Sequence, residues 1–230
     1  MANEEISFSD LIASSIHDMK NSVNIQIHAL ERVTQQIKEK VEPDDFDALV
    51  SVIAQAHRMD ANLIELLSLY KFGKSIYPLD ISEHSVNDVI AEVLLQKASV
   101  FRFRGIAVDT VCDAACYWYF DRDLVAGVLL NALNNAYNYT VDKIRVVAKI
   151  EDNWLTLRIE DNGRGYPASM LQDGAVDADK RVNFFSGSTG LGFYFSSQVT
   201  QLHQNQGRCG SLAIENGGTY GGGCFVVRLP

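Results

Sequence analysis

Asparagine side chains recur in the segment Asn131–Thr140, where Asn131 and Asn135 are four residues apart. On a helix this spacing places the two carboxamides on one face, with Asn134 turned elsewhere. A neutral carboxamide oxygen suits Mg²⁺ that is already bound to phosphates, because it adds a ligand without adding negative charge. Since asparagines are also frequent in helix caps and turns, the segment on its own leaves a purely structural role open.

A second motif, Asp161-Asn-Gly-Arg-Gly165, follows directly after a segment with strand periodicity. A carboxylate held at a strand end can accept a hydrogen bond from an exocyclic amino group, while flanking glycines let a planar base approach the backbone. The same residues are also typical of a hairpin turn. The motif therefore indicates a base-binding turn or an ordinary connection between strands.

A third motif, Gly187-Ser-Thr-Gly190-Leu-Gly192, leads into an amphipathic helical pattern. Glycines at a helix N-terminus expose backbone N–H groups and the positive end of the helix dipole to phosphate oxygens. The motif is not a Walker loop, because no Gly-Lys-Ser/Thr follows. It is not a Rossmann fingerprint either, because no strand directly precedes it.

The segment between the last two motifs, Tyr166–Ser186, is polar and has no regular periodicity. Segments of this length without secondary structure are usually functional lids or disordered. Lys180 and Arg181 in such a lid could reach a triphosphate, although a solvated surface loop fits the same composition.

Near the N-terminus, His17, Asp18 and Asn21 lie within one long helical pattern. His17 follows the apolar residue Ile16, so we expect it at the edge of a helix bundle and exposed to solvent. An exposed histidine in the middle of a helix is usually only a surface residue. Comparable neighbours are missing around the other four histidines, His28, His57, His84 and His203.

The elements that must position His17 have a heptad pattern. No proline or glycine occurs from about Phe8 to Lys40, and the apolar residues alternate at spacings of four and three, as in a coiled-coil seam. The seam residues are Ile12, Ile16, Met19, Val23, Leu30, Val33 and Ile37, with Gln26 in the remaining position. After a turn at Val41–Asp45, a second helix from about Asp45 to Tyr70 repeats the pattern.

Two long helices joined by a short turn predict an antiparallel hairpin. A single hairpin has only two apolar stripes and cannot enclose a core. We therefore expect two copies to form a four-helix bundle, which makes the chain a homodimer through residues 8–70.

The pattern changes after Lys71-Phe-Gly-Lys74, and strands and helices then mix. The expected fold class is α+β: the hairpin in residues 1–72, then an α/β sandwich in residues 73–230 with a mixed, mostly antiparallel sheet and three helices. Asp152-Asn153 is expected to form a hairpin turn. The expected helices are 82–103, 121–139 and one ending near 203, and the expected strands are 106–111, 117–120, 143–151, 154–160, 211–215 and 224–229.

The composition narrows the class of protein. Hydrophobic residues make up 47% and charged residues 21% of the 230 residues, as in ordinary globular chains. The net charge of −9 argues against a sequence-independent nucleic-acid binder, which needs a basic face. No apolar run is long enough for a membrane span and the N-terminus is acidic, so we expect a cytoplasmic protein without a membrane contact.

In this order the motifs resemble the transmitter core of two-component sensor histidine kinases, and the resemblance runs from about residue 8 to Pro230. Each motif is similar to one sequence box of that family. In chain order these are His17–Asn21 (H box), Asn131–Thr140 (N box), Asp161–Gly165 (G1 box), Phe184-Phe185 (F box), Gly187–Gly192 (G2 box) and the closing strand 221–230.

The resemblance implies a Bergerat-type ATP-binding domain attached to a dimerisation and phosphotransfer hairpin, with ATP and Mg²⁺ as cofactors. In that family the γ-phosphate of ATP passes to the histidine, here His17, oriented by Asp18. Asn21 then matches a position that orients water for dephosphorylating the partner. The implied nucleotide-binding residues are Asn131, Asn135 (also the metal ligand), Tyr139, Asp161, Gly163, Gly165, Lys180, Arg181, Gly187, Thr189, Gly190, Leu191 and Gly192.

The resemblance also implies partners. The phosphoryl group would pass to an aspartate of a response-regulator receiver domain. Because only about seven residues precede the hairpin, we expect a separate sensor protein that acts in trans.

Two residues depart from the family pattern. Ser22 stands where a proline is frequent, which predicts a straighter first helix. Asn138 stands where a lysine or arginine is usual, so a triphosphate contact would come from Lys180 or Arg181, or be weaker.

Two other function classes remain as alternatives. A phosphotransferase or scaffold of the same architecture that no longer uses ATP would have eroded nucleotide motifs, yet Asn135, Asp161, Gly190 and Gly192 are present. An ATPase of the chaperone, topoisomerase or mismatch-repair kind needs a catalytic glutamate on the N-box helix, where this chain has asparagine.

Overall fold

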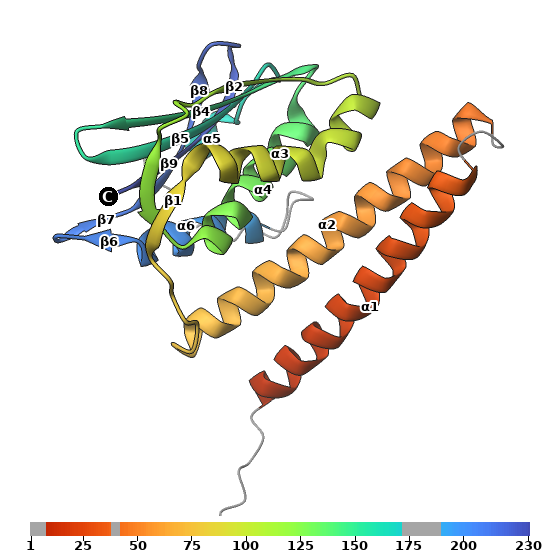
Figure 1. The fold of residues 1–230 in the computed structure, drawn as a ribbon, viewed down its shortest axis with the longest axis horizontal. Helices are drawn as coiled ribbons and strands as arrows, with labels where there is room; N and C mark the ends of the chain where they lie inside the picture. The colour runs from red at the N-terminus through yellow and green to blue at the C-terminus, as the bar shows by residue number, and fades with distance from the viewer. Residues whose placement is uncertain (1–7, 38–41, 172–189) are drawn as a thin grey trace, which may run out of the picture. The chain divides into compact units, whose positions relative to one another are not determined.

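The computed structural model describes residues 8–37, 42–171 and 190–230. The chain forms two compact units, Met1–Tyr77 and Pro78–Pro230. Figure 1 shows a helical hairpin in the first unit and a sheet with helices in the second. Among the described residues, no helix is long and apolar enough to cross a lipid bilayer.

The first unit consists of α1 (Phe8–Ile37) and α2 (Pro43–Gly73), packed as the predicted antiparallel hairpin. The second helix begins at a proline, which is tolerated in the first turn because N–H groups there have no helical partner. The first helix continues unbroken through Ser22, whose hydroxyl donates to the carbonyl oxygen of Asp18 at 3.0 Å.

Ion pairs and hydrogen bonds fix the register of the hairpin. Asp10 near the start of α1 contacts both Tyr70 and Lys74 near the end of α2. Further along, Glu31 contacts the Nε2 atom of His57 at 3.1 Å.

The predicted heptad seam divides between two surfaces of α1. The buried residues that face α2 are Ala13, Ile16, Val23, Ile27 and Thr34. By contrast, the predicted seam residues Ile12, Met19 and Val33 are 43–49% exposed. A heptad repeat read from sequence cannot tell which of its apolar residues face the second helix of the same chain.

The second unit contains a five-stranded sheet in the order β2-β4-β5-β9-β8. Only β2 and β4 pair in parallel, which confirms a mixed, mostly antiparallel sheet. The strands are β2 (Ala107–Val111), β4 (Lys143–Glu151), β5 (Trp154–Asp161), β8 (Ser211–Gly217) and β9 (Gly222–Leu229).

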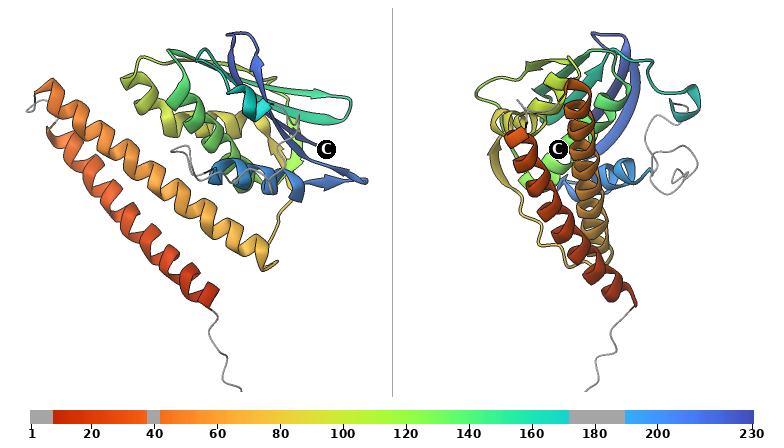
Figure 2. Two further views of the ribbon diagram at one scale, coloured as in Figure 1. Left: turned by 180° about the vertical axis from the view of Figure 1, so that it is seen from behind. Right: turned by 90° about the vertical axis from the view of Figure 1, so that its right-hand side faces the viewer.

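Three longer helices cover one face of this sheet (Figures 1 and 2). They are α3 (Val86–Phe103), α4 (Arg122–Tyr139) and α6 (Leu191–Leu202). Alternate residues of the strands point into this layer and are buried, among them Ile144, Val146, Leu155, Leu157, Ile159, Phe225, Val227 and Leu229. The described residues also include α5 (Ala168–Leu171), a single turn that the sequence did not predict.

The predicted helix over 82–103 is wrong at its start. Residues Ser82–Ser85 form strand β1, which pairs antiparallel with β3 (Tyr117–Phe120). The Ser85 hydroxyl accepts a hydrogen bond from the backbone N–H of Asp88 at 3.2 Å, and this cap starts the helix at Val86.

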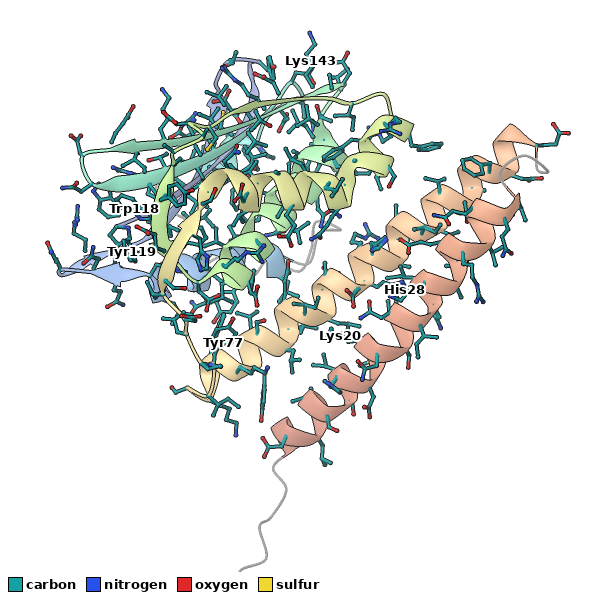
Figure 3. The ribbon with its side chains drawn as sticks, in the orientation of Figure 1. Lys20, His28, Tyr77, Trp118, Tyr119 and Lys143 are labelled. Carbon is teal, nitrogen blue, oxygen red and sulfur yellow. The ribbon has the colours of Figure 1, made fainter. Side chains whose placement is uncertain are left out.

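Strand β3 therefore belongs to a separate two-stranded sheet and not to the five-stranded one. Trp118 and Tyr119 of β3 lie at an edge of the second unit (Figure 3).

Two hairpin turns show how far local sequence decides backbone geometry. Asp152 and Asn153 both have positive φ (52° and 57°), which confirms the turn predicted between β4 and β5. A second hairpin, β6 (Gln204–Asn205) and β7 (Arg208–Cys209), was not predicted because strands of two residues have no periodicity.

Candidate functional site

Asp161 is the last residue of β5, and its carboxylate is held in one orientation. The residue is only 7% exposed. Its Oδ1 atom accepts hydrogen bonds from the backbone N–H groups of Gly163 at 2.7 Å and Gly223 at 3.2 Å. A carboxylate fixed in this way at a strand end is what recognition of an exocyclic amino group requires.

The two glycines of the G1 motif are required by close approach and by backbone conformation. A Cβ atom on Gly163 would lie 2.0 Å from the carbonyl oxygen of Tyr139, so the turn crosses directly over the end of α4. Gly165 has a positive φ of 73°, and a Cβ there would lie 2.7 Å from Oδ1 of Asn216. The Arg164 guanidinium between them lies over the Tyr139 ring, 5.7 Å from its centre.

Asn162 is a structural residue of the site that the sequence analysis missed. Its Oδ1 atom accepts hydrogen bonds from the Thr140 hydroxyl at 2.8 Å and from the backbone N–H groups of Val141, Asp142 and Lys143. These bonds join the chain after α4 to the end of β5, at the end of the sheet where Lys143 lies (Figure 3). The position of Asn162 directly after Asp161 could have indicated that it belongs to the site. The neighbouring sequence does not indicate which groups it would bind.

Asn131 and Gly192, from two different motifs, are brought into contact. The Asn131 amide nitrogen donates to the Ser196 hydroxyl at 3.0 Å, and the residue is buried. A Cβ on Gly192 would lie 2.2 Å from Oδ1 of Asn131, so α6 begins directly against this side chain. Asn135, one turn further along α4, is half-buried. Asn131 thus holds the two helices together.

The residue directly before helix α6 has a left-handed backbone conformation. Gly190 has φ 63° and precedes Leu191, the first helical residue, and its carbonyl oxygen accepts from the Tyr194 N–H at 3.1 Å. The N–H groups of the first turn have no helical acceptors, so this end of the helix suits an anion. The other predicted residues of this region, Lys180, Arg181, Phe184, Phe185, Gly187 and Thr189, lie outside the described residues.

A group of aromatic residues, which the motifs did not indicate, lies beside Asp161. Tyr166 contacts Phe193 edge to face, with ring centres 6.2 Å apart, and Phe193 contacts Phe225 at 5.7 Å. Burial, and then the negative charge of Asp161, raise the pKa of the Tyr166 phenol above its ordinary value. A neutral apolar surface beside a fixed carboxylate suits a planar, polar-edged ligand.

On the hairpin, the side chain of His17 is 59% exposed, as predicted. Its Nδ1 atom lies 3.8 Å from Oδ1 of Asp18 and 3.4 Å from Nδ2 of Asn21. Both neighbours approach Nδ1, so neither engages Nε2.

His17 and the exposed apolar residues lie on opposite sides of the hairpin. His17 directly follows the buried Ile16, whereas Ile12 and Val33 each directly precede a buried residue that faces α2, namely Ala13 and Thr34. On a helix, the residue after a given position lies about 100° around the axis in one direction, and the residue before it lies about 100° in the other direction. His17 and the exposed apolar residues therefore lie on opposite flanks of the surface that faces α2.

The second unit matches a known family model. Residues 120–230 match the model described as "Histidine kinase-, DNA gyrase B-, and HSP90-like ATPase". The chain is also similar to the signal transduction histidine-protein kinase AfsQ2 of Streptomyces coelicolor, with 24% identity over 94% of this chain and 41% of that protein. The sensor protein kinase WalK of Staphylococcus epidermidis is 26% identical over 96% of this chain and 36% of its own length.

The chain thus spans about two fifths of the length of these relatives. Among solved structures, the histidine kinase AdeS of Acinetobacter baumannii aligns with a TM-score of 0.60 at 18% identity, over 88% of this chain and 93% of that chain. The catalytic domain of histidine kinase ThkA aligns with a TM-score of 0.56 at 19% identity, over 66% of this chain and 97% of that chain. These structures share the hairpin-plus-sandwich fold or its catalytic part.

Proposed function

We propose that this chain, which is similar to sensor histidine kinases over most of its length, is such a kinase and uses ATP to phosphorylate His17. Residues 1–72 would act as the phosphotransfer hairpin and residues 73–230 as the catalytic domain. The observation that carries this proposal is the Asp161 carboxylate, held by two backbone N–H groups beside an aromatic surface, in the same chain as the exposed His17.

The proposed reaction depends on the neutral form of His17. Two groups compete for Nδ1, the Asp18 carboxylate at 3.8 Å and the donating Asn21 amide nitrogen at 3.4 Å. In the proposed reacting state the Asp18 carboxylate accepts a hydrogen bond from a protonated Nδ1 and the Asn21 amide turns away, which leaves the Nε2 lone pair free. Nε2 then forms the bond to the γ-phosphorus while the bond from this phosphorus to the bridging oxygen breaks, and ADP leaves. Asp18 stabilises the positive charge that develops on the ring and can take the Nδ1 proton.

The catalytic domain would bind the adenine and the phosphates of ATP with two different groups of residues. Asp161 is proposed to accept the adenine amino group, and the N-terminus of α6 from Gly190 onward to receive the phosphates. Bound Mg²⁺ supplies charge neutralisation of the phosphates. Asn135 is the proposed protein ligand, since Mg²⁺ on a nucleotide takes few protein ligands and accepts neutral oxygens.

We propose that the hairpin dimerises through a stripe of exposed apolar residues. This outer stripe consists of Ile12, Met19 and Val33 on α1 and Val52, Met59 and Leu66 on α2, all at least 39% exposed. On α1, Ile12 and Val33 each stand one position before a buried residue that faces α2. On α2, Val52, Met59 and Leu66 recur every seven residues and therefore share one face of that helix, which the proposal places on the same side of the hairpin. Two hairpins joined along this stripe would form a four-helix bundle that leaves His17 facing outward.

The proposed acceptor of the phosphoryl group is an aspartate on a response-regulator receiver domain, as expected for a two-component kinase. Asn21, one turn after His17, is proposed to orient water for the reverse, phosphatase direction. An Asn21→Ala variant should keep autophosphorylation and lose dephosphorylation of the regulator. A variant that retains both activities would remove this role from Asn21.

The test of the main proposal is incubation with γ-labelled ATP and Mg²⁺. The wild type should acquire acid-labile, alkali-stable label, and His17→Ala should acquire none. His28→Ala is the matched control, because His28 is an exposed histidine of the same helix beside an acid, Glu31, at 3.6 Å. Label on His17→Ala would exclude His17 as acceptor, and a wild type that binds no ATP would favour a phosphotransferase that does not use ATP.

A further inference from the structure

We propose that the β8–β9 hairpin is a clamp that holds the nucleotide-binding turn at both ends, with Asn216 and Gly223 as positioning residues. The turn is the segment Asp161–Tyr166, which leaves β5 and carries the G1 motif. This inference rests on the proposed function, because it assigns how the ATP site acquires its affinity and its preference for adenine.

The two positioning residues face each other across the hairpin. Asn216 of β8 and Gly223 of β9 are direct partners in the antiparallel register. The backbone N–H of Gly223 donates to Oδ1 of Asp161 at 3.2 Å, at the start of the turn. The Asn216 side chain accepts from the Tyr166 N–H at 2.6 Å and donates to the Tyr166 carbonyl oxygen at 2.8 Å, at its end.

The Asn216 carboxamide imitates a strand partner. A paired residue in a sheet donates one hydrogen bond and accepts one, and this side chain does both to the backbone of Tyr166. The backbone just before it, at Gly165, has a positive φ of 73° and cannot continue a strand. Asn216 thus holds a part of the turn that no strand can hold.

On β9, the clamp depends on two glycines, because a side chain at either position would collide with the turn. A Cβ on Gly223 would lie 2.9 Å from Oδ2 of Asp161 and 3.1 Å from Cε2 of Tyr166. A Cβ on Gly222 would lie 2.4 Å from the Asp161 carbonyl oxygen and 2.6 Å from Oδ1. Even one methyl group at these positions would displace the carboxylate or the Tyr166 ring.

The clamp should act on binding and not on the chemical step. A turn that is already held in its bound conformation loses little conformational freedom when the base enters. Asn216 is exposed, so its replacement removes the hydrogen bonds without opening a cavity in the core. Its loss should therefore weaken ATP binding while leaving the fold and the reaction of bound ATP intact.

The first test compares Asn216→Ala with the wild type in the full chain. We expect a Kd for ATP about tenfold higher by calorimetry, because two exposed backbone hydrogen bonds are lost. The KM for ATP in autophosphorylation should rise with it, while the rate at saturating ATP stays unchanged. Asn205→Ala, an exposed asparagine in the neighbouring β6–β7 hairpin, is the matched control and should keep both values.

The second readout needs no nucleotide. Hydrogen exchange of the Tyr166 amide in the ligand-free protein should become faster in Asn216→Ala. The Gly163 amide, which is held by Asp161, should keep its rate. Equal Tyr166 exchange in variant and wild type would overturn the clamp, whatever the enzyme does with ATP.

The third test uses Gly223→Ala, which moves the carboxylate itself. We expect the ratio of ATP to GTP affinity to fall toward one, because Asp161 would no longer be placed for the adenine amino group. An unchanged ratio would contradict the assignment of Gly223. A wild type that binds no ATP would overturn the proposed function together with this one, whereas wild-type binding with an unaltered Kd in Asn216→Ala overturns the clamp alone.

Discussion

The hairpin and the catalytic domain assemble their functional residues by opposite means. His17 contacts both Asp18 and Asn21 within about one turn of a single helix. In the second unit, Asn131 meets Ser196 across 65 residues of sequence and Asp161 meets Gly223 across 62. The proposed phosphoacceptor geometry therefore needs only a helix, whereas the proposed nucleotide site needs the packed core.

The difference extends to what buries the apolar residues. The second unit encloses a complete core, with Leu155, Leu157 and Leu229 at most 1% exposed. The hairpin leaves Met19 and Met59 about half exposed. Stability of the catalytic domain should thus depend on its own packing, and stability of the hairpin on the concentration of the chain.

The largest expected effect comes from the core of the second unit. Leu157→Ala on β5, the strand that ends at Asp161, should lower the free energy of unfolding of this unit by about 3 kcal/mol through the cavity it leaves. Urea unfolding followed by tryptophan fluorescence measures it, since Trp118 and Trp154 are both in this unit. Ile16→Ala in the hairpin is the comparison and should not change the urea midpoint of this transition. An equal decrease of the midpoint in both variants would show that the two units unfold together.

The second-largest expected effect is a loss of ATP affinity when the buried carboxylate of Asp161 is replaced. Asp161→Asn should weaken ATP binding about 100-fold, because an amide replaces an acceptor by a donor in a buried site. Calorimetric titration gives the affinity. The control is Asp109→Asn, the same change at an exposed carboxylate on β2, where binding should not change. Equal affinities in both variants would remove Asp161 from the nucleotide site.

The outer stripe should show a smaller, concentration-dependent effect. Met19→Glu is expected to raise the dissociation constant of the dimer by about tenfold, because a charge would enter the helix interface. Sedimentation at several concentrations measures this constant. Ile25→Glu is the matched control, since Ile25 is 71% exposed on the same helix but off the stripe. Equal weakening by both variants would argue that net charge, and not the stripe, controls association.

The smallest expected effect is a pH dependence of the free energy of unfolding of the second unit, caused by His203. Burial lowers the pKa of His203 below its ordinary value of 6.5. Its Nδ1 atom lies 2.7 Å from the Val199 carbonyl oxygen, and Nε2 accepts from the Asp121 N–H at 3.0 Å, so the neutral ring fits and the protonated ring breaks a bond.

The sign of this dependence follows from proton binding. The unfolded chain takes up a proton on His203 near pH 6.5 and the folded chain only at lower pH, so stability is complete above 6.5 and falls as the pH decreases through that interval. Urea unfolding at a series of pH values checks it. His203→Gln should flatten the curve, while His28→Gln on the hairpin should not; an unaltered curve in His203→Gln would assign the dependence to another group.

Much of the fold was predictable because its signals are local. The strands at 117–120 and 143–151, the turn at Asp152-Asn153 and the helix ending at Tyr139 follow from residue periodicity and turn chemistry. The prediction failed where a cap decided the boundary, at Ser85, and where strands were too short to show a period, at β6 and β7.

For the candidate site, the sequence supplied the residue types but not their contacts. Glycines 163, 165 and 192 could be singled out by their motifs. That each one makes room for a specific group, the Tyr139 carbonyl, the Asn216 amide and the Asn131 amide, depends on elements far apart in the chain. The same holds for Asn162 and Asn216, whose partners no local pattern reveals.

The sequence by itself determined the two-part organisation, the amphipathic hairpin with an exposed His17, and the order of the motifs, because helix and strand periodicity are properties of neighbouring residues. Only the tertiary structure decided which half of the heptad pattern faces α2, that Asn131 supports α6, and that the β8–β9 hairpin holds both ends of the Asp161 turn. These are long-range contacts, set by how the sheet and helices pack, and a linear pattern does not contain them.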